Sequence, residues 1–130
     1  MQIRAPEIRK LTDHTGAEVS GIDLSRPVDA ATTAALNRAF VEHHVLAIRD
    51  QHLDPKQVLA AVELFGPVFP QHNTKFALPN CPQIHYLSNQ DSFPDGRRYI
   101  PGEGWHTDHS NDARPPKATA LCRHPAEHGR

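Results

Sequence analysis

The chain has 130 residues, of which 38% are hydrophobic, and its 14 basic side chains nearly balance 15 acidic ones. This length suits one domain with a modest core, and the balanced charge gives no reason to expect nucleic acid or an anionic membrane as a partner. No apolar stretch approaches the ~20 residues that span a bilayer, and the first residues lack the apolar region of a signal peptide, so we expect a cytoplasmic protein. The ten histidines are the unusual component, and they make metal chemistry worth testing.

The first half of the chain contains regular hydrophobic patterns. We expect β structure within residues 1–24, where 16–22 alternate between glycines. The next segment predicts a helix over 30–43 that is capped by Asp29. Its apolar stripe consists of Ala35, Leu36, Ala39 and Phe40. The strand that we expect to follow is buried and covers 45–48.

A second helix is predicted to begin at Asp54-Pro55, because aspartate is a favoured cap and proline suits the first helical position. We expect this helix to end at Gly66. Its apolar stripe consists of Val58, Leu59, Val62 and Phe65.

The second half of the chain is rich in turn-forming residues. Most of the 12 prolines lie after residue 65, which favours loops and short strands over helices. We expect strands at 84–87, 105–110 and 117–122. Two helices followed by β structure predict an α+β fold that is incomplete.

One short motif has the composition of a metal site. His106 and Asp108 are separated by a single residue, so in a strand both side chains would lie on the same face. An imidazole and a carboxylate on one face can occupy adjacent corners of an octahedral metal. A second histidine would complete the 2-His-1-carboxylate triad of Fe(II) oxygenases, which leaves three positions open.

The spacing alone is a weak indication, because about 0.7 such pairs are expected by chance in a chain of this composition. His52 and Asp54 have the same spacing, and there a loop histidine followed by a helix cap is the better explanation. Two solvated surface residues would be the simpler interpretation of His106 and Asp108 if nothing else were known. A cupin-type metal module is a further alternative, but it needs a histidine-rich motif with a nearby glutamate that the sequence lacks.

Five segments around the motif occur in an order typical of one protein family. They are 16–24 (Gly-Ala-Glu-Val-Ser-Gly-Ile-Asp-Leu), 45–51 (Val-Leu-Ala-Ile-Arg-Asp-Gln), 64–66 (Leu-Phe-Gly), 104–108 (Gly-Trp-His-Thr-Asp) and 115–119 (Pro-Pro-Lys-Ala-Thr). Together they resemble the TauD/TfdA family, which contains taurine dioxygenase and 2,4-dichlorophenoxyacetate dioxygenase. The resemblance extends to Leu121 and covers under half of a typical member, so we interpret 1–121 as the N-terminal part of such a domain.

The resemblance implies a double-stranded β-helix (jelly-roll) core with flanking helices. It also implies that His106 and Asp108 bind Fe(II), and that 2-oxoglutarate is the co-substrate. The expected activity is that of an oxidoreductase that uses O₂ to hydroxylate a C–H bond of a small organic acid, a sulfonate or a carboxylate. Succinate and CO₂ would be released, and the cofactors would perform the chemistry that the protein positions. Full-length relatives are expected to be homo-oligomers.

Three further residues receive roles from the resemblance. Asn89 follows a predicted strand at a place where some members have a polar active-site residue, so we expect it to contact the cofactor; a capped strand end would explain it equally well. His72 lies where the substrate-facing loop begins and is a candidate substrate contact, with a solvated loop histidine as the alternative. Trp105 is expected to pack against the core.

The family's distal iron-binding histidine and its 2-oxoglutarate-binding arginine lie near the C-terminus of full-length members, and we expect neither in this chain. His124 and His128 follow too closely to replace them. Residues 122–130 are polar and lack the expected strand pattern. A GC-rich back-translation read one nucleotide later can encode Ala-Val-Thr-Leu-Pro-Ser-Thr-Gly-Gly-Asp, which resembles the family's continuation. We therefore interpret 122–130 as an out-of-frame tail; the alternative function is that of a catalytically inactive truncated fragment or pseudogene product.

Overall fold

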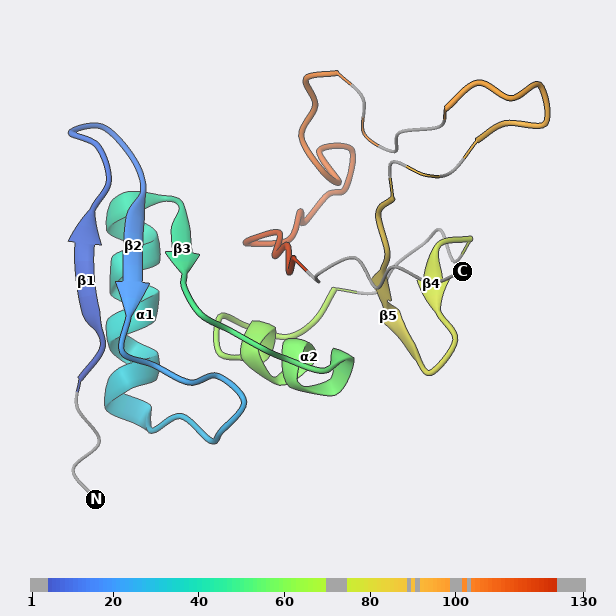
Figure 1. Cartoon of the computed structure of the whole chain (residues 1–130). Helices are drawn as coiled ribbons and strands as arrows, with labels where there is room; N and C mark the ends of the chain where they lie inside the picture. The colour runs from blue at the N-terminus through green and yellow to red at the C-terminus, as the bar shows by residue number, and fades with distance from the viewer. Residues whose placement is uncertain are drawn as a thin grey trace. The chain divides into compact units, whose positions relative to one another are not determined.

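The computed structural model describes residues 5–69, 75–88, 90, 92–98, 102 and 104–123. The chain forms two compact units, Met1–Pro67 and Val68–Arg130. The first unit holds three strands and both helices, and the second holds a two-stranded sheet and long loops (Figure 1). This α+β content agrees with the predicted fold class.

The sheet of the first unit consists of β1 (Glu7–Lys10), β2 (Ala17–Ser20) and β3 (Leu46–Ile48), in that order. The central strand β2 is antiparallel to β1 and parallel to β3. Along β2, the buried Ala17 and Val19 alternate with partly exposed neighbours, because successive side chains in a strand point to opposite faces. The β structure predicted for the first 24 residues is therefore a hairpin. The predicted strand 45–48 is confirmed from Leu46 onward, but its predicted burial is wrong, because β3 is only partly buried and Val45 is exposed.

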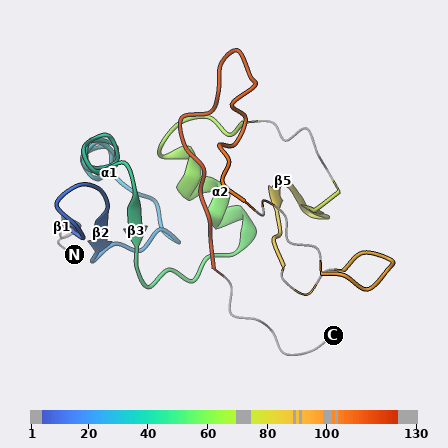
Figure 2. The same ribbon diagram turned by 90° about the horizontal axis from the view of Figure 1, so that it is seen from above.

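Helix α1 (Ala30–His43) has the predicted bounds and the predicted cap. The Asp29 carboxylate accepts a hydrogen bond of 2.8 Å from the backbone N–H of Thr32, which satisfies one of the free donors at the helix start. The helix lies along one side of the sheet (Figure 2). Leu36 of α1 and Val19 of β2 are the largest fully buried side chains, so the core of this unit lies between helix and sheet.

Helix α2 (Pro55–Glu63) begins where the sequence predicts and ends three residues early. Asp54 and Gln57 form a reciprocal capping box, in which each side chain bonds the backbone N–H of the other at 2.9 Å. The predicted end at Gly66 is wrong because the last turn tightens: the N–H of Gly66 bonds the carbonyl of Glu63, three residues back.

Among the described residues, no helix is long and apolar enough to cross a membrane.

The second unit contains an antiparallel pair, β4 (Ala77–Leu78) and β5 (Cys81–His85). The strand predicted at 84–87 therefore begins and ends earlier, because its ladder partners belong to β4. The strands predicted at 105–110 and 117–122 are wrong. A positive φ of 51° at His109 and a turn closed by Asp112 interrupt the first, and the second has no ladder partner within the described residues.

Candidate functional site

His106 and Asp108 face each other in a surface loop of the second unit. The His106 Nε2 atom lies 3.2 Å from the Asp108 Oδ1 atom. The two side chains are 53% and 46% exposed, so a solute can reach both. The sequence predicts that the two side chains lie close together because both belong to one strand. In the structure they lie close together in a loop that consists of turns and bends.

The imidazole of His106 is oriented by its other nitrogen. Nδ1 lies 3.0 Å from the backbone carbonyl of Gly104. Since a carbonyl can only accept, Nδ1 carries the proton of this hydrogen bond, and in the neutral ring Nε2 keeps its lone pair. A Cβ atom built on Gly102 would lie only 2.9 Å from the His106 Cε1 atom, so the ring lies directly against this glycine.

The two carboxylate oxygens of Asp108 have different neighbours. Oδ1 faces the imidazole, whereas Oδ2 accepts a hydrogen bond of 3.1 Å from the Thr119 hydroxyl. Nε2 and Oδ1 therefore lie close together, and the other nitrogen of the imidazole and the other oxygen of the carboxylate each have a hydrogen-bond partner of their own.

The neighbouring histidine, His109, is directed at other partners. Its Nδ1 atom lies 3.3 Å from the Asp112 Oδ2 atom, and its ring centroid lies 4.8 Å from that of Phe69. In the part of the chain that the structure describes, no group of three or more His, Cys, Asp or Glu side chains could hold a metal ion. The described residues thus bring together two of the side chains that a three-ligand site needs.

Trp105 does not pack against a core, contrary to the prediction. Its side chain is fully exposed. The prediction assumed a strand at 105–110, and in the loop that replaces this strand the indole has no sheet layer to cover. His72 and Asn89, the predicted substrate and cofactor contacts, lie outside the described residues, as do His124 and His128.

The sequence did not reveal Thr119, Gly102 or Gly104 as neighbours of the pair. Gly104 and Thr119 belong to the segments 104–108 and 115–119 that carry the family resemblance. That membership suggests that both residues matter for the family, but it does not predict that Thr119 contacts Asp108, eleven residues earlier in the chain. Gly102 has no such signal, because its role depends on where the His106 ring lies.

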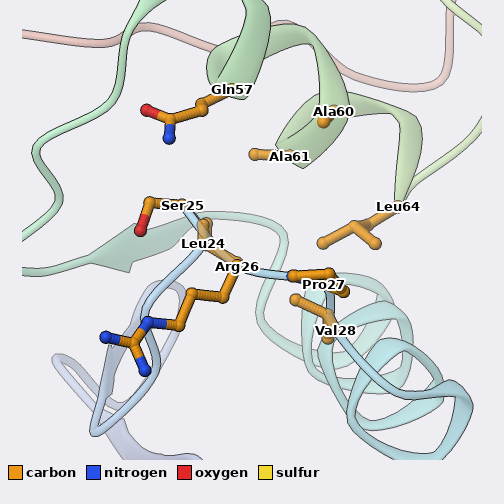
Figure 3. A pocket seen from close by; sticks show the side chains of 9 residues that line it. All are labelled: Leu24, Ser25, Arg26, Pro27, Val28, Gln57, Ala60, Ala61 and Leu64. Carbon is orange, nitrogen blue, oxygen red and sulfur yellow. The ribbon is translucent and has the colours of Figure 1, made fainter.

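The first unit contains a cavity of about 370 Å³ between α2 and the loop that precedes α1 (Figure 3). It is lined by Leu24, Ser25, Arg26, Pro27, Val28, Gln57, Ala60, Ala61 and Leu64. The Arg26 side chain extends away from α2 and pairs with Asp23 at 3.1 Å, and the Gln57 carbonyl accepts the bond of the capping box. The cavity is mainly apolar and has no acid–base or metal-binding constellation, so we do not regard it as the site of chemistry.

Comparison with known proteins gives consistent matches along the chain. Residues 7–129 match the model of the family described as "Taurine catabolism dioxygenase TauD, TfdA family". An alkylsulfatase of Acinetobacter baylyi is 38% identical over 104 residues, which cover 78% of this chain and 30% of that protein. An alpha-ketoglutarate-dependent sulfate ester dioxygenase of Pseudomonas putida is 34% identical over 117 residues, or 88% of this chain and 36% of that protein.

A solved structure is also similar. The crystal structure of a candidate alpha-ketoglutarate-dependent taurine dioxygenase from Burkholderia xenovorans is 27% identical, with a TM-score of 0.61. The match covers 69% of this chain and 32% of that one. The chain thus spans about a third of the length of the curated relatives that it matches.

Proposed function

Because the chain belongs to the taurine catabolism dioxygenase TauD/TfdA family, we propose that it supplies two metal ligands, His106 and Asp108, of an Fe(II)- and 2-oxoglutarate-dependent dioxygenase. The observation that carries this proposal is the 3.2 Å approach of the His106 Nε2 atom to the Asp108 Oδ1 atom. The donors are those of the facial triad, an imidazole and a carboxylate.

The separation of the two atoms fits a shared cation. Ligands at adjacent corners of an octahedron with bonds of about 2.1 Å lie about 3 Å apart. A neutral imidazole nitrogen and a carboxylate oxygen that face each other repel unless a proton or a cation lies between them. The hydrogen bond from Nδ1 to the Gly104 carbonyl supports the role, because metal-binding histidines commonly donate their other N–H to such a partner.

In this proposal the chain binds and orients one side of the metal. The bound Fe(II), with 2-oxoglutarate and O₂, would supply hydroxylation of a substrate C–H bond coupled to formation of succinate and CO₂. The partial exposure of His106 and Asp108 leaves room for the remaining ligands.

The proposed substrate class is a small organic acid. Two relatives have names that refer to sulfate esters or alkyl sulfates, and the similar structure is described as acting on taurine. These names favour a sulfonate or sulfate ester, and a carboxylate stays open. The jelly-roll core of the whole enzyme, its homo-oligomeric state, its cytoplasmic location and the roles of His72 and Asn89 stay predictions.

The test is a titration of the 130-residue chain with Mn(II), followed by the NMR signals of its histidine rings. Paramagnetic broadening should affect His106 first among the ten histidines. His106→Ala and Asp108→Asn should remove the selective effect. His52→Ala is the matched control, because His52 has the same spacing to an aspartate that caps α2. Equal broadening of all histidines, or selective broadening that persists in Asp108→Asn, would contradict the proposal.

The second candidate is the catalytically inactive fragment, and it is favoured because no group of three or more potential metal-binding side chains comes together among the described residues. We also propose, from the composition of residues 122–130, that this tail is read out of frame. The nucleotide sequence of the gene tests the second point: the shifted frame should encode a distal histidine and an arginine further downstream, and their absence there would refute it.

A further inference from the structure

The hydroxyl of Thr119, in the segment 115–119, donates a hydrogen bond of 3.1 Å to the Asp108 carboxylate of the candidate metal pair. We propose that Thr119 is a positioning residue that fixes the orientation of the Asp108 carboxylate toward the metal. This inference rests on the proposed function, in which Asp108 is a metal ligand. It gives the segment 115–119 a role that the metal pair alone does not explain.

The two carboxylate oxygens of Asp108 have different partners. The Thr119 hydroxyl donates to Oδ2 at 3.1 Å, and Oδ1 lies 3.2 Å from the His106 Nε2 atom. The terminal torsion of an aspartate is broad, so a half-exposed carboxylate without a fixed partner adopts a wide range of torsion angles. A donor fixed on Oδ2 selects the orientation in which Oδ1 faces the imidazole, and hydrogen bonds to charged groups are the stronger ones.

The same arrangement occurs on the other ligand. The His106 ring uses Nδ1 to bond the Gly104 carbonyl, as Asp108 uses Oδ2 to accept from Thr119. In each side chain, the atom that does not face the other side chain of the pair forms a hydrogen bond with a neighbouring group. Such outer hydrogen bonds are a common feature of metal sites, and their loss typically costs 10–100-fold in metal affinity.

Two prolines precede Thr119 and restrict the backbone that places its hydroxyl beside Asp108. Residues 118–123 form no regular secondary structure and have no ladder partner in the described structure. Pro115 and Pro116 restrict their own φ angles and favour an extended conformation at the residue before each of them. This restriction limits the directions in which the chain can leave the turn before it reaches Thr119.

If Thr119 positions Asp108, loss of its hydroxyl should change metal affinity; if Thr119 only stabilises the loop, the loss should change thermal stability. Thr119 is exposed, so removing its hydroxyl leaves no buried group unsatisfied and should alter stability little. The orientation of Asp108, by contrast, should be lost. Metal affinity should therefore change while the midpoint of thermal unfolding does not.

The test compares the 130-residue chain with Thr119→Val, Thr119→Ser and the control Thr107→Val. Thr107 is also an exposed threonine of this loop, and it lies between the two ligands. In Thr119→Val, the Mn(II) concentration that halves the His106 ring signal should rise about tenfold or more. Thr119→Ser and Thr107→Val should stay close to the parent chain.

The outcomes distinguish the two proposals. If Mn(II) broadens His106 selectively and equally in the parent and in Thr119→Val, Thr119 has no positioning role and the metal pair stands. If the parent shows no selective broadening, the proposed function fails and the inference fails with it. Thr119→Ala repeats the comparison should the valine variant lose its native spectrum, and retention of parental affinity by the alanine variant would also overturn the inference.

Discussion

At the scale of single residues, Gly102 has a steric role that the nearby Gly104 does not share. Its φ is +75°, and an added Cβ would meet the His106 ring at 2.9 Å. Gly102→Ala should therefore move the imidazole away from Asp108 and weaken Mn(II) binding. The measurement is the selective broadening of the His106 ring signals.

Gly96 provides a matched control for this substitution. Its φ is +83°, so alanine meets a similar backbone penalty of about 1 kcal/mol, but nothing lies within 4 Å of the added Cβ. Gly96→Ala should leave Mn(II) binding at the parental level. Equal loss of binding in both variants would show that backbone strain, rather than contact with the ring, is responsible.

Gln51 is the second residue with a specific role, because its side-chain amide joins two segments of the first unit. The carbonyl oxygen accepts from the Leu24 N–H, and the amide nitrogen donates to the Ile22 carbonyl, both at 2.8 Å. The amide nitrogen also donates to the Arg49 carbonyl at 2.6 Å. Gln51→Leu removes all three bonds and leaves partly buried backbone groups unsatisfied, which should lower the free energy of unfolding by about 1–3 kcal/mol. Urea denaturation measures this change.

The control for Gln51 is Gln83→Leu. Gln83 is exposed on β5, where such a substitution usually changes stability by no more than about 0.5 kcal/mol. If the two variants unfold at the same urea concentration, the hydrogen bonds of Gln51 do not stabilise the unit.

At the scale of elements, Glu18 of β2 joins β1 to the residue that directly follows β3. Its carboxylate lies 3.0 Å from the Arg9 Nη2 atom and 2.8 Å from the Arg49 Nε atom. Hydrogen bonds from Arg9 and then Arg49 hold the pKa of Glu18 below its ordinary value of 4.5. The unfolded chain therefore binds a proton more readily at this site than the folded one.

The sign of the pH dependence follows from that difference. The stabilising contribution of Glu18 is present above the ordinary pKa and is lost as the pH falls through the lowered pKa of the folded state. In Glu18→Gln, the decline of stability between about pH 5 and pH 3 should be shallower than in the parent. Thermal unfolding midpoints across this range measure it, with Glu7→Gln on β1 as the control. A parental slope in Glu18→Gln would refute the role of the cluster.

The helices could be predicted and the later strands could not, for a physical reason. The caps of α1 and α2 depend on residues three positions apart, Asp29 with Thr32 and Asp54 with Gln57, and these are visible in the sequence. A strand needs a partner that the local sequence does not identify. Ile84 and His85 joined β5 because β4 lies beside them, whereas 105–110 and 117–122 had the composition of strands and found no ladder partner among the described residues.

The candidate site could be predicted in part for the same reason. The one-residue spacing of His106 and Asp108 keeps them close in many backbone conformations, so their approach did not require the strand that the prediction assumed. The hydrogen bond from Thr119 joins positions eleven residues apart and depends on the path of the intervening turn. Contacts of that kind become visible only in three dimensions.

At the scale of the whole molecule, the chain covers about a third of its curated relatives, and in the proposed function the described loop contributes two metal ligands, His106 and Asp108. Two protein ligands leave a metal exposed to water and hold it weakly in comparison with a complete triad. We therefore expect this chain with Fe(II) to release CO₂ from labelled 2-oxoglutarate no faster than free iron does.

Radiometric capture of the CO₂ measures the rate of release. The references are free Fe(II) and the His106→Ala variant. All three rates should agree, even though Mn(II) binding distinguishes the parent from the variant. Release above the free-iron rate that disappears in His106→Ala would refute the expectation. It would require a further ligand from outside the described residues, and it would make the chain a working catalyst rather than an incomplete site.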